Sequence, residues 1–140
     1  MPGPTDRRDG RAQTIGGARQ TARTAGLAPR RSATIAGLGG QAAELHAWLG
    51  PAIGPDAFEV GAEVRDAYVA RLPGSEACFT RNERGRYLAD LYRLARLVLD
   101  AAGVGAVHGG GWCTHRDRDR FFSFRRDGVT GRMATLAWLA

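Results

Sequence analysis

Apolar residues occur along the chain in short runs whose spacing indicates helices interspersed with strands. The run at residues 46–50, HAWLG, is closed by Gly50-Pro51, which is typical of a buried strand entering a turn. In residues 87–103 the apolar side chains recur at helical spacing, and Gly103 follows as a left-handed helix end. This stripe consists of Leu88, Leu91, Ala95, Val98, Leu99 and Ala102. We therefore predict a strand at 46–50 and a helix over 87–103.

Three further segments are predicted before that helix. A short helix begins near Ser32 and ends at Gly39-Gly40. Asp56 and Glu59 have the spacing of a capping box, which predicts a helix start. The face of this helix comprises Val60, Val64, Ala67 and Tyr68. Residues 71–85 are polar and contain Pro73-Gly74, so we expect a surface loop there.

The sequence changes from helical to strand spacing after Gly103. Residues 104–107, 121–124 and 133–139 are predicted strands, and RRDGVTG supplies turn residues that join the last two as a hairpin. The three glycines at 109–111 permit backbone geometry that a side chain would block. Helices interspersed with strands predict an α/β (α+β) fold with layered mixed β-sheets.

Charge is concentrated at the start of the chain. The 140 residues carry a formal charge of +6, and residues 1–31 hold seven Arg against Asp6 and Asp9. This Arg/Gly-rich segment has few large apolar side chains, so we predict a disordered leader at 1–31 and one folded unit over 32–140. Because the rest of the chain is nearly neutral, we expect no nucleic-acid partner.

Cysteine content and hydropathy bear on the compartment. Cys78 and Cys113 are the two cysteines, without a C-x-x-C pattern or a hydrophobic leader that would suggest secretion. The apolar runs are broken by charge well short of the roughly 20 residues that span a bilayer. We therefore expect a cytoplasmic protein with reduced thiols and no membrane partner.

Histidine and cysteine residues raise the question of a metal site. Imidazole and thiolate are the usual zinc ligands, and His46, His108, His115 and Cys113 supply them. Cys113 and His115 lie two apart, which places both on one side of a strand, but no second close pair completes a set of four ligands. Ordinary polar histidines are the favoured interpretation. The sequence also lacks the Walker, G-x-S-x-G and H-E-x-x-H patterns.

The segment FFSFRRDGVTGRM places three arginines around a glycine-containing turn. Arg125, Arg126 and Arg132 suit phosphate or carboxylate, because a planar guanidinium forms paired hydrogen bonds and a turn adds backbone donors. The alternative is that they form surface ion pairs, which is the commoner fate of such charges. The possible acidic partners are Asp117, Asp119 and Asp127. Spacing alone favours ion pairs.

Several blocks together resemble a known family. These are AWLGPAIGPDAFEVGAEVRDAY, LADLYRLARLVLDAAGV, CTH and FFSFRRDGVTGRMATLAWL. In order and spacing they are similar to the C-terminal half of laccase-domain (YfiH-like) proteins, the multi-copper polyphenol oxidoreductase family, from about Ala33 to Leu139. The resemblance implies stacked mixed sheets flanked by helices, as in the deamidase domain of cytotoxic necrotizing factors, here truncated.

The resemblance also implies a chemistry. Family members are purine nucleoside phosphorylases that convert adenosine, inosine and methylthioadenosine with phosphate to the base and a ribose 1-phosphate. Adenosine deamination is a side activity, and older names are polyphenol oxidase and laccase. Zinc or copper is the cofactor of the intact family. In this setting Arg125, Arg126, Asp127 and Arg132 are the candidate phosphate- or substrate-binding residues.

The departures from the family concern its reactive groups. Relatives hold their metal with two His and one Cys, in a segment with an Asp-Cys dipeptide and a His-Ala-Gly-Trp-Arg-Gly block, and neither pattern occurs here. Cys113 belongs to the later CT motif, and its role stays open. We therefore assign no catalytic or metal residue, expect no cofactor, and predict little activity from this chain alone.

Two consequences and two alternatives follow from a missing front half. Strands without partners leave open edges, so self-association is possible. A frameshift or a misplaced start codon would explain the leader. The alternatives to an enzyme fragment are an inert binding or interaction module and a truncated pseudogene product.

Overall fold

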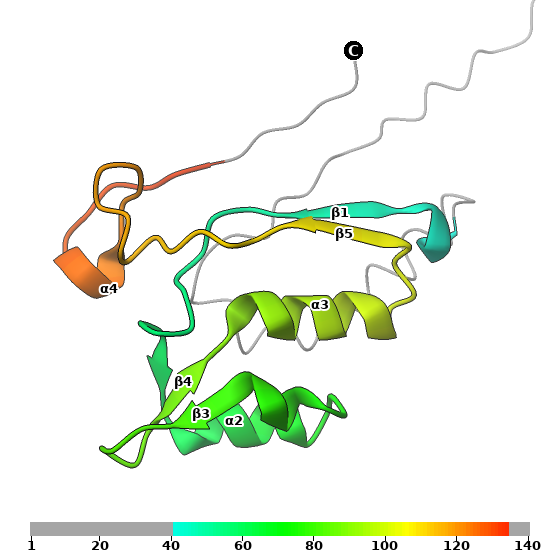
Figure 1. Ribbon diagram of the computed structural model, residues 1–140, viewed down its shortest axis with the longest axis horizontal. Helices are drawn as coiled ribbons and strands as arrows, with labels where there is room; N and C mark the ends of the chain where they lie inside the picture. Colours follow the sequence, from blue (N-terminus) through cyan, green and yellow to red (C-terminus); the bar gives the residue numbers. More distant parts are fainter. Residues whose placement is uncertain (1–40, 135–140) are drawn as a thin grey trace, which may run out of the picture.

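The computed structural model describes residues 41–134 (Figure 1). Within this range the elements run in the order η2 (Ala42–Glu44, a 3-10 helix), β1 (His46–Leu49), β2 (Glu59–Val60), α2 (Ala62–Val69), η3 (Ser75–Cys78, a 3-10 helix), β3 (Phe79–Arg81), β4 (Tyr87–Ala89), α3 (Leu91–Ala101), β5 (Ala106–Gly109) and α4 (Phe124–Asp127). The strands form one small parallel sheet and one small antiparallel sheet. The mixed α/β class predicted from the sequence is confirmed.

The parallel sheet consists of β1 and β5. Its register pairs His46 with Ala106 and Leu49 with Gly109. Helix α3 runs alongside this sheet (Figure 1), and Arg96 Nη2 at its middle donates a hydrogen bond to the carbonyl of Gly109 (2.6 Å). A helix between two parallel strands is the expected connection, because parallel strands need a long crossover. The strand predicted at 46–50 is confirmed over β1, but the prediction that it is buried is wrong, because its residues alternate between exposed and half-buried and Trp48 is 57% exposed.

The antiparallel sheet has the order β2-β4-β3 and forms much of the core. Phe79 pairs with Ala89, and Glu59 pairs with Leu88. Tyr68 of α2 is buried against Phe79, with ring centroids 6.0 Å apart. The buried cluster comprises Ile53, Phe58, Val60, Tyr68, Cys78, Phe79, Ala89 and Leu94. Both sheet and helices therefore bury apolar faces against a common core.

The predicted helix start at Asp56 is wrong. Gly54 O accepts hydrogen bonds from the amides of residues 57 and 58, which closes a turn, and α2 begins only at Ala62. Glu59 lies in β2 and its carboxylate serves the β3–β4 turn instead of a helix end. Asn82 Nδ2 donates to it at 2.6 Å and Arg84 Nη2 lies 2.7 Å away. The Glu59 carboxylate, which the predicted capping box needed, is thus bound to Asn82 and Arg84 instead.

The predicted loop at 71–85 and the helix start at residue 87 also need correction. Residues 75–78 form η3 and residues 79–81 form β3, because Phe79 joins the core. Residues 87–89 form β4 between two partner strands. Helix α3 starts after Asp90, whose Oδ1 accepts a hydrogen bond from the Arg93 amide (2.9 Å) as an N-cap. Its predicted end at Gly103 is confirmed by a positive φ of 74°.

Of the three strands predicted after Gly103, one is found at a slightly later position. The strand predicted at 104–107 lies slightly later, at β5 (Ala106–Gly109). The strand predicted at 121–124 is wrong, because the carbonyl of Ser123 accepts hydrogen bonds from the amides of residues 126 and 127 and so closes α4. Residues 133–134 form no strand, so the hairpin is not found, and residues 135–139 lie outside the described range. The glycines at 109–111 have φ values of 78°, 88° and 87°.

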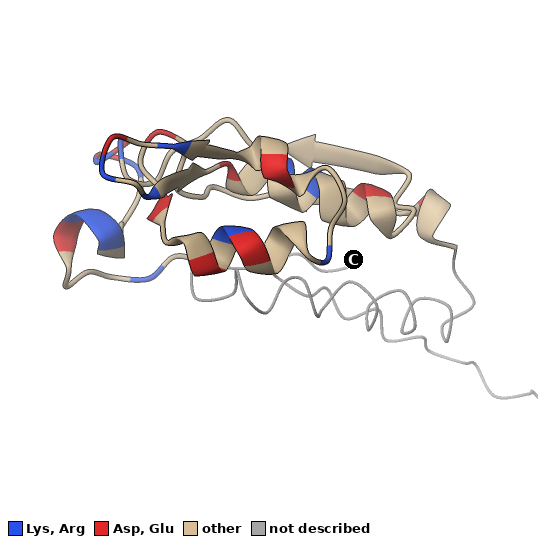
Figure 2. Ribbon diagram, turned by 90° about the horizontal axis from the view of Figure 1, so that it is seen from below, with Lys and Arg blue, Asp and Glu red and all other residues tan. Residues whose placement is uncertain are grey.

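The leader predicted at 1–31 and the short helix predicted near Ser32 lie outside the described residues. Over the described range, Asp and Glu are interspersed among Arg (Figure 2). None of the helices in that range has the length and apolar character needed to cross a bilayer.

Candidate functional site

A pocket of about 480 Å³ lies between two loops at the α4 end of the molecule. One wall is the loop at residues 54–57, and the other comes from the loop at residues 111–118 together with the Arg126 side chain. The second wall contributes Trp112, His115 and two arginines, Arg116 and Arg118. An aromatic face next to cationic side chains suits a flat ligand that carries negative charge.

The two walls are joined directly by backbone contacts. Ala52 and Cys113 form a parallel bridge, and the Thr114 amide donates to the Ala52 carbonyl (2.9 Å). The Gly54 amide donates to Cys113 Sγ (3.2 Å), and a Cβ at Gly54 would lie 3.1 Å from that sulfur. The buried Cys113 therefore packs closely against Gly54 in the lining of the pocket, and a side chain at residue 54 would press against its sulfur.

Tyr92 of α3 links both walls to the rest of the fold. Its hydroxyl accepts a hydrogen bond from the Ala52 amide (2.8 Å) and donates one to the Trp112 carbonyl (3.0 Å). Burial raises the pKa of the Tyr92 hydroxyl, while its hydrogen bonds with the two backbone groups act in the opposite direction. The hydroxyl thus stays protonated at neutral pH and can serve both bonds.

Arg126 is the most strongly held side chain of the pocket. It is 8% exposed, and its Nη1 donates to the carbonyls of Thr114 and His115 (both 2.9 Å) while Nη2 donates to the Phe121 carbonyl (3.0 Å). Nε and Nη2 also contact the two carboxylate oxygens of Asp127 (2.8 Å each). Hydrogen bonding from Arg126 lowers the pKa of the Asp127 carboxyl. The guanidinium therefore holds the surrounding backbone in place through these hydrogen bonds.

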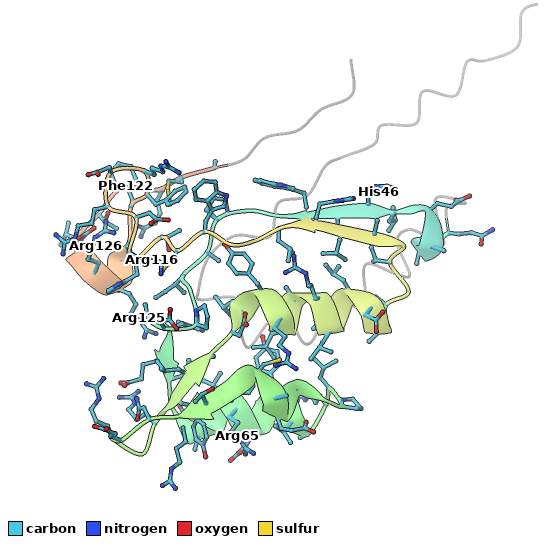
Figure 3. All side chains as sticks on the ribbon, viewed as in Figure 1. His46, Arg65, Arg116, Phe122, Arg125 and Arg126 are labelled. Carbon is cyan, nitrogen blue, oxygen red and sulfur yellow. The ribbon has the colours of Figure 1, made fainter. Side chains whose placement is uncertain are left out.

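The four residues singled out by sequence do not form one anion-binding face. Arg125 Nη1 donates to the Glu59 carbonyl (2.8 Å) and its guanidinium lies over the Phe58 ring, 5.2 Å from the centroid. Figure 3 shows Arg125 directed toward β2, whereas Arg116 and Arg126 lie together beside α4. Arg132 contacts only nearby carbonyls of its own segment among the described residues. Their role in binding stays a prediction.

Sequence reasoning missed three pocket residues. Trp112, Arg116 and Arg118 line the cavity, and Arg120 lies over the Trp112 ring at 5.0 Å from its centroid. The alternation RDRDR at 116–120 was a signal for surface charge, but nothing in its spacing predicts which arginines face the pocket. Arg116 approaches Asp117 only loosely, at 3.9 Å. The guanidinium of Arg116 is therefore held by fewer and longer contacts than that of Arg126.

The histidines and cysteines are divided between three places. His46 and His108 contact each other across β1 and β5, His115 and Cys113 belong to the pocket, and Cys78 is in the core. Burial raises the pKa of the Cys78 thiol, so that sulfur stays protonated. Within residues 41–134 no cluster of three or more His, Cys, Asp or Glu side chains has the arrangement of a metal site.

The sequence also matches a family profile over most of its length. The profile is described as multi-copper polyphenol oxidoreductase laccase, and it matches residues 20–140. The chain belongs to this family. Crystal structures support the assignment: a Neisseria meningitidis protein superposes with a TM-score of 0.70 at 49% identity, covering 77% of this chain and 44% of that protein. YlmD from Geobacillus stearothermophilus gives a TM-score of 0.70 at 31% identity, covering 80% and 42%.

Several bacterial relatives of this chain are named purine nucleoside phosphorylases. The enzyme of Pseudomonas aeruginosa is 56% identical over 108 residues, which cover 76% of this chain and 45% of the enzyme. YfiH of Escherichia coli is 53% identical over 93 residues, which cover 66% and 38%. The chain therefore spans less than half the length of these laccase-domain relatives.

The copper in the name of the laccase-domain family can be tested against the residues present. Cys113 Sγ is buried under the pocket and accepts a hydrogen bond from Gly54, and the His46–His108 pair lies on the other sheet. The described residues therefore do not offer the three-ligand set that a resident catalytic metal needs. We derive no chemical step through a metal for this part of the fold.

Proposed function

We propose that this chain is the C-terminal part of a purine nucleoside phosphorylase of the laccase-domain family. Its reaction would be the phosphorolysis of adenosine, inosine or methylthioadenosine to the base and ribose 1-phosphate, with adenosine deamination as a side activity. The observation that carries the proposal is the 56% identity to the Pseudomonas aeruginosa phosphorylase. The polyphenol oxidase name of the family is not the activity we propose.

The part that this chain plays is to form and support a substrate pocket. The pocket places the Trp112 side chain, over which Arg120 already lies, beside the cations of Arg116 and Arg118, a composition suited to a purine and a phosphate. Arg126 fixes the shape of one wall. The four residues predicted from sequence, Arg125, Arg126, Asp127 and Arg132, remain candidates for shaping the pocket or binding at its edges.

We further propose that the reacting groups are supplied from outside this chain. The Asp-Cys dipeptide and the His-Ala-Gly-Trp-Arg-Gly block are absent from the 140 residues. Without a metal or an activated nucleophile, binding and positioning alone give little rate enhancement over the reaction in water. The isolated chain is therefore expected to release no measurable hypoxanthine from inosine.

The test is fragment complementation. The part of the Pseudomonas aeruginosa enzyme that precedes its matched region is co-expressed with this chain, and phosphate-dependent hypoxanthine release from inosine is measured. The matched control co-expresses the same front part with the enzyme's own C-terminal part. Activity in both pairs, with none from the chain alone, supports the proposal. Activity in the control pair only would contradict it, and turnover by the chain alone would overturn the assignment of reacting groups.

The phosphate role of Arg126 has a separate test in the intact Pseudomonas enzyme. Ala is substituted at the position that matches Arg126, and the KM for phosphate is measured well below the unfolding temperature. A ligand role predicts a raised KM for phosphate. Unchanged kinetics would rule out phosphate binding by this residue and leave only its hydrogen bonds to the backbone carbonyls.

One observation favours the alternative of a binding module. Trp48, Phe122 and Phe124 are 57%, 53% and 66% exposed, and exposed aromatic side chains are enriched on surfaces that meet another chain. A module of this kind would bind a partner without gaining activity. Failure of complementation in a pair that nevertheless co-purifies would favour it over the enzyme fragment.

A further inference from the structure

The histidine pair on the parallel sheet lies outside the pocket and plays no part in the function proposed above. His46 is the first residue of β1, and His108 lies near the end of β5. Because the register pairs His46 with Ala106 and Trp48 with His108, the two histidines are diagonal neighbours on one face of the sheet. Both side chains belong to exposed residues, and Figure 3 shows His46 on the side of β1 away from α3.

The two rings already place their nitrogens at a separation that a metal ion requires. His46 Nδ1 lies 3.2 Å from His108 Nε2, and the rings are nearly parallel with centroids 5.3 Å apart. Two imidazole nitrogens bound to one tetrahedral ion at about 2.0–2.1 Å are about 3.3 Å apart, because the ligand–metal–ligand angle is near the tetrahedral value. The observed separation therefore needs little change when an ion replaces the hydrogen bond.

We propose that His46 and His108 form a two-imidazole site for a borderline divalent ion such as Zn²⁺ or Ni²⁺. Imidazole is a preferred ligand of these ions, and water would complete the coordination because the pair is open to solvent. This departs from the expectation of no metal residue drawn from the sequence. It concerns a surface site and not the three-ligand centre of the family.

The proton balance of binding is simple. In the free protein one ring donates the N–H that the other accepts. When the ion binds to Nδ1 of His46 and Nε2 of His108, each neutral ring carries its proton on the other nitrogen, which faces water or backbone. One tautomer shift therefore suffices, and no net proton is released from two neutral rings. The paired backbones of β1 and β5 keep the Cα atoms in place while the exposed rings rotate.

The test uses the full 140-residue chain after removal of metal with EDTA. Zn²⁺ is titrated by calorimetry into the unchanged chain, into His46→Gln, into His108→Gln and into the double variant. We expect one equivalent bound by the unchanged chain and affinity at least about tenfold weaker in each single variant, since even loss of an outer-shell partner costs about 10- to 100-fold. His115→Gln is the matched control and should bind like the unchanged chain.

A second measurement locates the ion independently of affinity. Paramagnetic Ni²⁺ should broaden the imidazole proton resonances of His46 and His108 at substoichiometric amounts while those of His115 stay sharp. Far-UV circular dichroism of each variant verifies that the exposed substitutions leave the fold unchanged. Equal Zn²⁺ binding by the double variant and the unchanged chain, or broadening of His115 alone, would overturn the site. Neither result bears on inosine phosphorolysis, so the two proposals fail separately.

Discussion

Replacing Arg126 with Ala removes the donor that holds two stretches of backbone, at residues 114–115 and at residue 121, beside the pocket. The carbonyls of Thr114, His115 and Phe121 each lose a hydrogen bond of 2.9–3.0 Å to the guanidinium. An unsatisfied carbonyl costs about 1–3 kcal/mol, and the lower end applies because water can reach these groups through the adjoining pocket. The expected loss is therefore about 3 kcal/mol in the free energy of unfolding. The contact with Asp127 adds little, because that carboxylate is exposed.

Urea unfolding of the full chain, followed by circular dichroism, measures this loss as a lower midpoint at unchanged slope. Arg118→Ala is the matched control, because it removes the same charge from an exposed residue of the same pocket wall. Its effect should stay within about 0.5 kcal/mol. Arg126→Lys should fall between the two, since an ammonium keeps the charge but lacks the planar fork that reaches three carbonyls. Equal stabilities of Arg126→Ala and Arg118→Ala would refute the reasoning.

Three further predictions concern the supports of the pocket. Tyr92→Phe leaves the Ala52 amide and the Trp112 carbonyl without their partner and should lower the free energy of unfolding by about 1–3 kcal/mol in urea titration. Gly109→Ala should destabilise more than its control Gly111→Ala: both have positive φ, but a Cβ at Gly109 would overlap the Leu49 carbonyl oxygen, whereas Gly111 has open space. Asp127 has a pKa lowered from 3.8 by Arg126, so its contribution is present at neutral pH and is lost as the pH falls through that lowered pKa. Asp127→Asn should therefore weaken the decline of the urea midpoint below about pH 4, and an unchanged decline would contradict this.

Sequence patterns predicted the elements whose residues determine their own conformation. The strand at β1 and the end of α3 at Gly103 were found because an apolar run bounded by Gly-Pro and a glycine at a left-handed position are local signals. Strands β2 and β4 were not found, because each is very short and exists through pairing with a distant segment. Glu59 shows the difficulty: its spacing fits a helix cap, but its carboxylate binds Asn82 across the sheet.

The candidate site was predictable in composition but not in arrangement. The segment around Arg125 and Arg126 was identified, and the ion pair of Arg126 with Asp127 is the fate that spacing alone favoured. That the two neighbouring arginines point to different places depends on α4, whose residues were predicted as the end of a strand and the start of a turn. The contact between His46 and His108 likewise arises from a parallel pairing of strands 62 residues apart in sequence, which no local spacing reveals.

The contacts that shape the pocket are made within this chain, whereas the open strand edges and the exposed Trp48 belong to the β1–β5 sheet. Tyr92 and Arg126 hold the pocket loops through backbone groups that belong to this same chain. By contrast, within the described residues β1 and β5 pair only with each other, and Trp48 on β1 is 57% exposed. A front part of the family fold supplied from outside would therefore gain most by pairing with the open edges of the β1–β5 sheet and packing on its exposed aromatic area. Because Trp48 shares its face with His46 and His108, the Zn²⁺ site proposed above belongs to the unassembled chain. Complementation should then depend on Trp48 for assembly and on the pocket residues for turnover, which separates failure to associate from failure to react.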